Sequence, residues 1–139
     1  MADKDNVAIA RRGFDAWNAH DIEGWLKVLD PNQVTESDTL PAAIRGHDGA
    51  RPFMQMYIKA FPDLRFTIDQ MIGHDQYVVT RYTASGTHKG DLAGIPATGR
   101  RAQTRGCTVA EFKNGKIVHQ WIYWDTGHLL RQLGVLPGA

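Results

Sequence analysis

The first thirty residues place apolar side chains at helical spacing. Over residues 3–20 the apolar positions recur every three or four residues, which predicts one amphipathic helix with a single apolar stripe. Asp21 is a suitable N-cap for a second, shorter helix over residues 22–29. That helix should end at Asp30-Pro31, because proline disfavours a helical conformation in the residue before it.

The next segment combines one short strand with a third helix. Residues 33–39 favour a strand, and Asp48 is expected to cap the helix that follows. Pro52 is compatible with this helix only in its first turn, where its missing N–H would have no helical partner. Pro62 is expected to end the helix.

After Pro62 the hydrophobic period changes from helical to strand-like. Four β-rich runs are predicted, over residues 64–72, 76–85, 104–113 and 116–124, with a turn at residues 73–75 between the first two. Asn114-Gly115, between the last two runs, is the strongest short hairpin signal that a sequence offers. Residues 86–101 form a long glycine-rich loop, which is expected to be functional or mobile. A short last helix should end at Gly134.

Helices followed by antiparallel strands predict an α+β fold. We expect a single domain over residues 1–139, in which a curved antiparallel sheet wraps around the N-terminal helices as a conical barrel and encloses a pocket. The aromatic side chains support a cavity, because they are too many for a core of this size unless some of them line one. They include Trp17, Phe53, Tyr57, Trp121, Tyr123 and Trp124.

Composition narrows the class of protein further. Sixteen basic residues against fifteen acidic ones leave a net charge of +1, which gives no general attraction to nucleic acid or to a membrane surface. The single cysteine, Cys107, rules out an internal disulfide and is compatible with a reducing compartment. The N-terminal residues lack the apolar run of a signal peptide. We therefore expect a cytoplasmic protein that binds neither nucleic acid nor a membrane.

Motifs for cofactors and metals are missing from the sequence. The glycines at positions 86, 90, 94 and 99 fit neither the dinucleotide-binding nor the Walker spacing. The six histidines do not form a zinc-binding pattern, and a Gly-x-Ser-x-Gly nucleophile motif is absent. We expect no cofactor and no bound metal.

Two long motifs carry a family resemblance. They are GTHKGDLAGIPATGR at residues 86–100 and NGKIVHQWIYWDTGHLLRQLG at residues 114–134, with FPDLRF at residues 61–66 as further support. With these motifs the chain resembles the SnoaL-like polyketide cyclases, a family within the nuclear-transport-factor-2-like superfamily. The resemblance implies a cofactor-free enzyme or binder that acts on a hydrophobic, carbonyl-bearing, polyketide-like small molecule. It also implies a homodimer that associates through the outer face of the sheet.

The aldol cyclases of this family use an aspartate in the last strand as a general base. A carboxylate in an apolar cavity loses hydration, so its pKa rises and it becomes a competent base near neutral pH. The resemblance matches this aspartate with Ile122, and it matches the assisting polar residues with Thr108, Gly106 and Thr35. Isoleucine carries no proton, so the usual aldol mechanism does not transfer to this chain.

Three other residues are candidates for catalysis. Asp125 matches an aspartate that recurs in the family, although its position before a short helix also suits an N-cap, and a capping carboxylate is a poor base. His88 lies in the family's GTH motif and could donate to a substrate carbonyl or instead hold the glycine-rich loop. Glu36, with Asp38 on the same strand face, could point into the cavity or be solvated.

The remaining candidates would bind substrate. The aromatic excess and the resemblance together indicate Trp17, Thr35, Phe53, Tyr57, Thr108, Gln120, Ile122 and Trp124, with positions 120, 122 and 124 on the inward face of the last strand. The leading hypothesis is a cyclisation, isomerisation or related proton-transfer step on a bound carbonyl compound. Two alternatives are a hydroxylase-like or hydrolytic member with a carboxylate-held water, and a non-catalytic binding module.

Overall fold

Three helices open the chain, as the hydrophobic pattern predicts. In the computed structural model, which describes residues 3–136 and side chains from residue 5 onward, α1 spans Asp3–Asn18, α2 spans Ile22–Val28 and α3 spans Gly46–Ala60. The first two and last three residues of the expected domain lie outside the described residues. A fourth short helix, α4, covers Thr126–Gln132 and ends before Gly134, whose φ is 79°.

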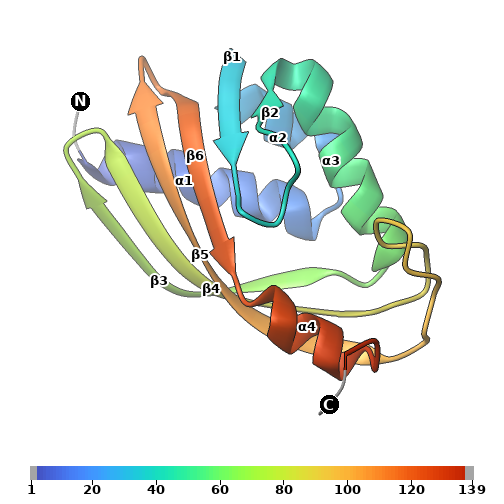
Figure 1. Cartoon of the computed structure of the whole chain (residues 1–139). Helices are drawn as coiled ribbons and strands as arrows, with labels where there is room; N and C mark the ends of the chain where they lie inside the picture. The colour runs from blue at the N-terminus through green and yellow to red at the C-terminus, as the bar shows by residue number, and fades with distance from the viewer. Residues whose placement is uncertain (1–2, 137–139) are drawn as a thin grey trace.

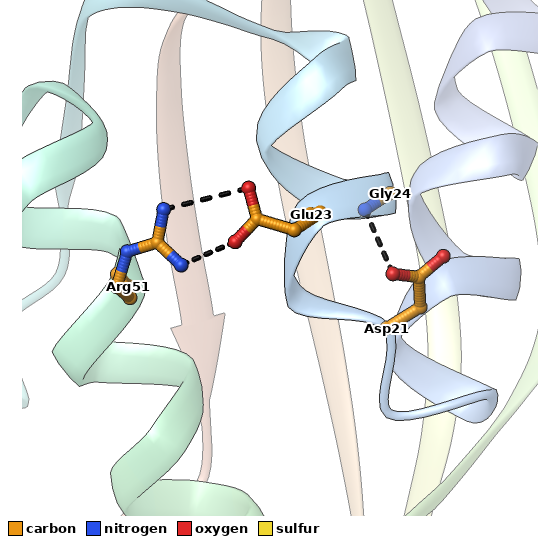
Figure 2. Close-up of polar contacts among 4 residues, drawn as sticks. All are labelled: Asp21, Glu23, Gly24 and Arg51. Carbon is orange, nitrogen blue, oxygen red and sulfur yellow. Dashed lines mark hydrogen bonds and ion pairs between the residues drawn. The ribbon is translucent and has the colours of Figure 1, made fainter.

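Asp21 caps α2 as the sequence predicts (Figure 2). The Gly24 amide donates to Asp21 Oδ1 at 3.0 Å, which satisfies one of the free N–H groups at the helix start. A side chain at Gly24 would place its Cβ 2.3 Å from Asp21 Oδ2, so the cap and the glycine depend on each other.

A salt bridge joins α3 to α2. Arg51 on α3 donates a hydrogen bond to the carboxylate of Glu23 on α2, and this hydrogen bond lowers the pKa of the Glu23 carboxyl. Both side chains are exposed, so the pair contributes little to stability.

The start of α3 differs from the expectation. The helix begins at Gly46, so its N-cap is Arg45, which makes no capping side-chain bond, and Asp48 lies in the first turn instead of at the cap. Pro52 consequently falls inside the helix and not in its first turn. There it cannot donate to the carbonyl four residues earlier, a cost that the packing of α3 against β1 and α2 must offset.

Six strands form one curved, open sheet (Figure 1). They are β1 (Leu29–Glu36), β2 (Ile44–Arg45), β3 (Arg65–His74), β4 (Tyr77–Thr87), β5 (Arg101–Lys113) and β6 (Lys116–Trp124), in the order β2-β1-β6-β5-β4-β3. The α+β class is confirmed. The sheet is mixed, however, because β1 runs parallel to β6 while every other ladder is antiparallel.

The two predicted turns between neighbouring strands are present. Asn114 and Gly115 have φ values of 53° and 75°, as the predicted tight turn between β5 and β6 requires. The turn between β3 and β4 falls later than expected, with Asp75 at a φ of 53°, so that Gly73 and His74 still belong to β3. The register Gly73↔Val78 and His74↔Tyr77 accounts for this shift.

The helices lie on the concave side of the sheet, where they leave room for a cavity. Helix α1 contacts β3 and β4, α3 contacts β1 and β2, and α2 packs against both other helices. Figure 1 shows α4 at the end of β6, on the opposite end of the molecule from the β5–β6 hairpin. Within residues 3–136 no helix is long and apolar enough to cross a membrane.

Candidate functional site

A cavity lies between the helices and the concave face of the sheet. We call it the inner chamber; it contains about 750 Å³ of space free of protein atoms, counted out to its open mouth. The helices contribute Phe14, Trp17, Trp25, Phe53 and Tyr57, and the sheet contributes Phe66, Tyr82, Ile122 and Trp124. The predicted pocket therefore exists, and its wall is largely aromatic.

Successive edge-to-face contacts join these rings into one continuous wall. The contacts run from Tyr82 through Phe66, Trp17, Phe53 and Tyr57 to Trp124, with centroid separations of 5.1 to 6.0 Å. Aromatic pairs in this geometry are favourable beyond the area they bury. Each ring also restricts the rotamers of the next, so the chamber is largely pre-formed for an apolar ligand.

A chain of buried hydrogen bonds orients the amide of Gln120 at the chamber wall. Gln33 Nε2 donates to the Gly46 carbonyl at 3.1 Å, so Gln33 Oε1 accepts from the Thr35 hydroxyl at 2.6 Å. The Thr35 oxygen in turn accepts from Gln120 Nε2 at 3.0 Å. Gln120 Oε1 is thus the amide atom left available, and it gives the chamber one hydrogen-bond acceptor.

Two tyrosines, Tyr57 and Tyr82, bring phenol groups to the lining of the chamber. Burial raises the pKa of Tyr82 to about 12, and burial together with the neighbouring Tyr82 raises the pKa of Tyr57 further. A tyrosine phenol is protonated at neutral pH in any case, and the raised pKa extends the pH range over which these two can donate a hydrogen bond. They are poor bases under the same conditions.

Gly106 creates the space that Tyr82 occupies. The two residues pair directly across β4 and β5, and a Cβ at position 106 would lie 2.5 to 2.6 Å from the tip of the Tyr82 ring. The resemblance puts a polar side chain at this position in the cyclases, whereas here a phenol from the next strand fills the volume. The signal in the sequence was a glycine in the middle of a strand.

Strand β6 divides its side chains between the two faces of the sheet. Gln120, Ile122 and Trp124 line the inner chamber, whereas Tyr123 is 53% exposed on the outer face. The register shift in the β5–β6 ladder lies between Ile117 and His119 on β6, so the pairing from Gln120 to Trp124 is regular and the alternation holds over these positions. Ile122, which the resemblance matches with the cyclase base, is part of the chamber wall.

Asp125 lies beyond the end of β6 and outside the chamber lining. Its Oδ1 accepts from the His128 amide at 2.9 Å, so it caps α4 as the sequence suggested. The carboxyl is exposed, which keeps it hydrated. Its catalytic role stays a prediction, and its geometry is that of a helix cap.

Glu36 lies on the outer face of the sheet. Its Oε2 is 2.5 Å from His119 Nε2, and His119 stacks on Trp121 with ring centroids 4.1 Å apart. Neighbouring Thr35 is buried on the inner side, behind Gln120, and does not itself line the chamber. Glu36 therefore forms a surface pair, and its proposed role in catalysis gains no support from this position.

His88 is fully buried beneath the glycine-rich loop. Its Nδ1 accepts from the Thr98 amide at 3.2 Å and lies 3.0 Å from the Thr98 hydroxyl, while the ring packs on Phe61. The loop is also tied to the end of α3, because the amides of Lys89 and Gly90 both donate to the Ala60 carbonyl. His88 thus holds the loop in place and does not line the inner chamber.

Seven of the eight predicted binding residues line the chamber, and they come from four separate elements. They are Trp17, Phe53, Tyr57, Thr108, Gln120, Ile122 and Trp124. Reasoning from the sequence missed Phe14, Trp25, Phe66 and Tyr82. Phe14 lies on the same apolar stripe as Trp17, and Tyr82 shares its strand face with Thr80, so helix and strand periodicity could have identified both.

The family model for SnoaL-like polyketide cyclases matches residues 7–133, and the chain belongs to this family. No match was found among the curated proteins. The fold is also that of several solved structures. AclR, described as a putative hydroxylase from Streptomyces galilaeus, is 28% identical, with a TM-score of 0.88 over 99% of this chain and 86% of AclR.

Two further structures have similar scores. TsrD from Streptomyces laurentii is 27% identical, with a TM-score of 0.87 over 98% of this chain and 99% of TsrD. IdmH, described as a putative polyketide cyclase from Streptomyces antibioticus, is 26% identical, with a TM-score of 0.81 over 94% of this chain and 99% of IdmH. The likeness extends over the whole domain and does not single out one reaction.

Proposed function

We propose that this protein binds a hydrophobic, carbonyl-bearing small molecule in the inner chamber and hydrogen-bonds its carbonyl through Tyr57 and Tyr82. The observation that carries the proposal is the combination of an aromatic wall with neutral polar groups. Within the described chain, the polar residues of the wall are the two phenols, Thr80, Thr108 and Gln120, together with the indoles. A neutral carbonyl compound suits such a site, because a charged ligand would lose its hydration without gaining a counter-charge.

Hydrogen bonding to a carbonyl oxygen also favours reaction. A donor that faces the oxygen stabilises the negative charge that develops there in enolisation or in attack on the carbonyl carbon. The aromatic wall would hold a flexible substrate in a folded conformation, which lowers the entropic cost of ring closure. The reaction best supported is therefore a cyclisation or isomerisation in which the protein supplies hydrogen-bond donors and shape, and water or the substrate accepts the proton.

A non-catalytic binding module is the second candidate function. Ile122, in the position of the cyclase base, favours it, because the chamber then lacks the group that usually removes the proton. The identity of 28% to a putative hydroxylase keeps hydroxylation as a third alternative by relationship alone. Association of two copies through the outer face of the sheet is proposed on the family resemblance.

Matched ligands test the binding proposal directly. 1-Tetralone and tetralin differ by one carbonyl, and either should quench the fluorescence of Trp17, Trp25 and Trp124 in the chamber wall. Replacing Tyr82 or Tyr57 by Phe should weaken ketone binding by about fivefold and leave the hydrocarbon unchanged, as expected for one neutral hydrogen bond. Tyr123→Phe on the outer face is the control. Absence of quenching by both compounds would contradict the proposal.

Exchange of the ketone's α-hydrogens separates the two candidate functions. In D2O, a protein that activates the carbonyl should speed deuterium incorporation next to it, as seen by NMR, and Tyr82→Phe should slow that exchange. A pure binding module would bind the ketone and leave the exchange rate at its value in buffer. The same samples therefore report binding and proton transfer independently.

A further inference from the structure

A second, smaller cavity adjoins the inner chamber at the end of the molecule where β6 stops. We call it the outer chamber; it contains about 380 Å³, also counted to its mouth. Its walls come from the C-terminal end of α3, the C-terminal end of β4, the N-terminal end of β5, and α4. Tyr57, Leu64 and Trp124 belong to the linings of both chambers, so the two spaces meet at these three side chains.

The walls of the outer chamber are unlike those of the inner one. The strands present Ala84, Gly86 and Ala102, which are small, and α4 presents Leu129. A Cβ at Gly86 would lie 3.0 Å from Phe61 Cβ, so Gly86 brings the strand close to the ring that forms another wall. Small residues in consecutive inward positions of two paired strands leave a channel that a slender apolar group can fill.

Thr104 is a buried polar residue in the lining of the outer chamber. The residue is only 7% exposed, and its hydroxyl is buried without a hydrogen-bond partner among the described residues. It faces inward on β5, opposite Ala84 on β4, and lines the chamber. A buried hydroxyl without a partner is costly, so a partner supplied by a ligand would bring a net gain.

The position of α4 explains how this end of β5 can form a chamber wall. Strand β6 ends opposite Gly106, so the edge of β5 beyond it has no neighbouring strand. The side-chain amide of Gln132 takes its place, accepting from the Gln103 amide at 2.9 Å and donating to the Gln103 carbonyl at 2.9 Å. These two hydrogen bonds hold α4, and with it Leu129, over the outer chamber.

We propose that the outer chamber binds the far end of an elongated ligand whose carbonyl-bearing end occupies the inner chamber. The ligand class is an apolar ketone that extends beyond two fused rings and carries a hydroxyl or carbonyl group at its other end, which hydrogen-bonds Thr104. This inference rests on the proposed function, since it assigns the second half of the same ligand. It adds Thr104, Ala84 and Leu129 as residues that determine specificity.

Three ligands and two variants test the inference. The ligands are 1-tetralone, 1-tetralone with an alkyl chain on ring position 6, and the same compound with a terminal hydroxyl. The wild-type protein should bind both chain-bearing ketones more tightly than 1-tetralone and should prefer the hydroxyl-ended one by about fivefold over the alkyl-ended one. Thr104→Val, which keeps the shape of the side chain, should abolish that preference, whereas Thr67→Val on the exposed face of β3 should keep it.

Ala84→Leu fills the outer chamber and provides an independent readout. It should lower the affinity for both chain-bearing ketones by about tenfold or more and leave 1-tetralone binding unchanged, which also shows that the variant is folded. Chains that add no affinity in the wild type, or a hydroxyl preference that survives in Thr104→Val, would overturn the inference while leaving the proposed function intact. Failure of 1-tetralone itself to bind would overturn both.

Discussion

The two faces of strand β6 have opposite chemistry. The inward face carries Gln120, Ile122 and Trp124, which are neutral and line the inner chamber. The outward face carries His119, which pairs with Glu36 on the neighbouring strand β1. The acid–base groups of this region are therefore in contact with solvent, and the chamber keeps groups that stay neutral at pH 7. The comparison shows that one strand separates ionisable side chains on its outer face from neutral ones that line the chamber.

Introducing an aspartate on the inward or on the outward face of β6 should show the difference in polarity between the two faces most strongly. Ile122→Asp puts a charge in the aromatic chamber and should lower the free energy of unfolding by about 3 kcal/mol or more at neutral pH, whereas Tyr123→Asp on the outer face should change it by less than about 1 kcal/mol. Urea unfolding followed by circular dichroism measures both. Equal losses would mean that the two faces do not differ in polarity as described.

The Ile122→Asp loss should also depend on pH. Burial raises the pKa of this carboxyl in the folded state above its unfolded value near 4, so the folded state binds more protons between the two pKa values. Stability therefore falls as pH rises through that window and recovers as pH falls. Tyr123→Asp should show a flat profile over the same range.

Gly106→Ala tests the close packing on the inward side. Its Cβ would lie within 2.6 Å of the tip of the Tyr82 ring, so the ring must shift towards the chamber that it lines. We expect a loss of about 1–3 kcal/mol of unfolding free energy, with weaker ketone binding because the phenol is displaced. Gly13→Ala on α1 is the comparison for stability, since its Cβ would meet Val28 at an ordinary 3.4 Å and alanine favours a helix more than glycine does, so this variant should be at least as stable as the wild type. Similar stabilities for the two variants would contradict the packing account.

Alkaline pH should act through the phenols of the chamber. The pKa of Tyr82 is raised to about 12 and that of Tyr57 is also raised, so each keeps its proton in the folded state after an unfolded tyrosine has lost it. Stability should consequently fall above pH 10, by up to about 1.4 kcal/mol per pH unit for each phenol. Tyr82→Phe should flatten this slope, and Tyr123→Phe should not.

Asp125, directly after β6, should act through the helix that it caps. Asp125→Ala should cost about 1 kcal/mol, because the His128 amide loses its acceptor, whereas Asp125→Asn keeps an acceptor and should be nearly neutral. Thermal unfolding gives the stabilities, and deuterium exchange of 1-tetralone gives the activity. An Asp125→Asn variant that is folded but inactive would identify the carboxylate as a base.

The smallest effect is expected on the outward side. Glu36→Gln removes one charge of a surface pair whose side chains are 50% and 26% exposed, so the cost should stay below about 1 kcal/mol. Ketone affinity and exchange should be unchanged. Loss of exchange in this variant would place the chemistry on the outer face and contradict the description of the inner chamber.

Local signals in the sequence were enough for most of the fold. The cap at Asp21, the turn at Asn114-Gly115 and the alternation along β6 each depend on neighbours within a few residues, and all three are present. The alternation also bears on Thr35 and Glu36, since adjacent residues of a strand point to opposite faces. Both were candidates for the site, and the structure puts Thr35 inside and Glu36 outside.

Other features depend on contacts between distant segments. The parallel pairing of β1 with β6 joins segments about eighty residues apart, and nothing in either strand specifies its direction. The phenol over Gly106 and the Gln132 amide at the edge of β5 likewise arise only when the sheet is assembled. The start of α3 at Gly46 was predicted wrongly although it depends on local sequence, because an aspartate such as Asp48 suits an N-cap and a first turn equally well.

The vibrational frequency of a bound ketone reports directly on the hydrogen bonds that its oxygen accepts. With 13C-labelled 1-tetralone, we expect a carbonyl stretch at lower frequency than in an apolar solvent, because Tyr57 and Tyr82 donate to the oxygen. The band should return towards the apolar-solvent value in the variant that carries both Tyr57→Phe and Tyr82→Phe. A bound carbonyl that absorbs as in an apolar solvent in the wild-type protein would contradict the account.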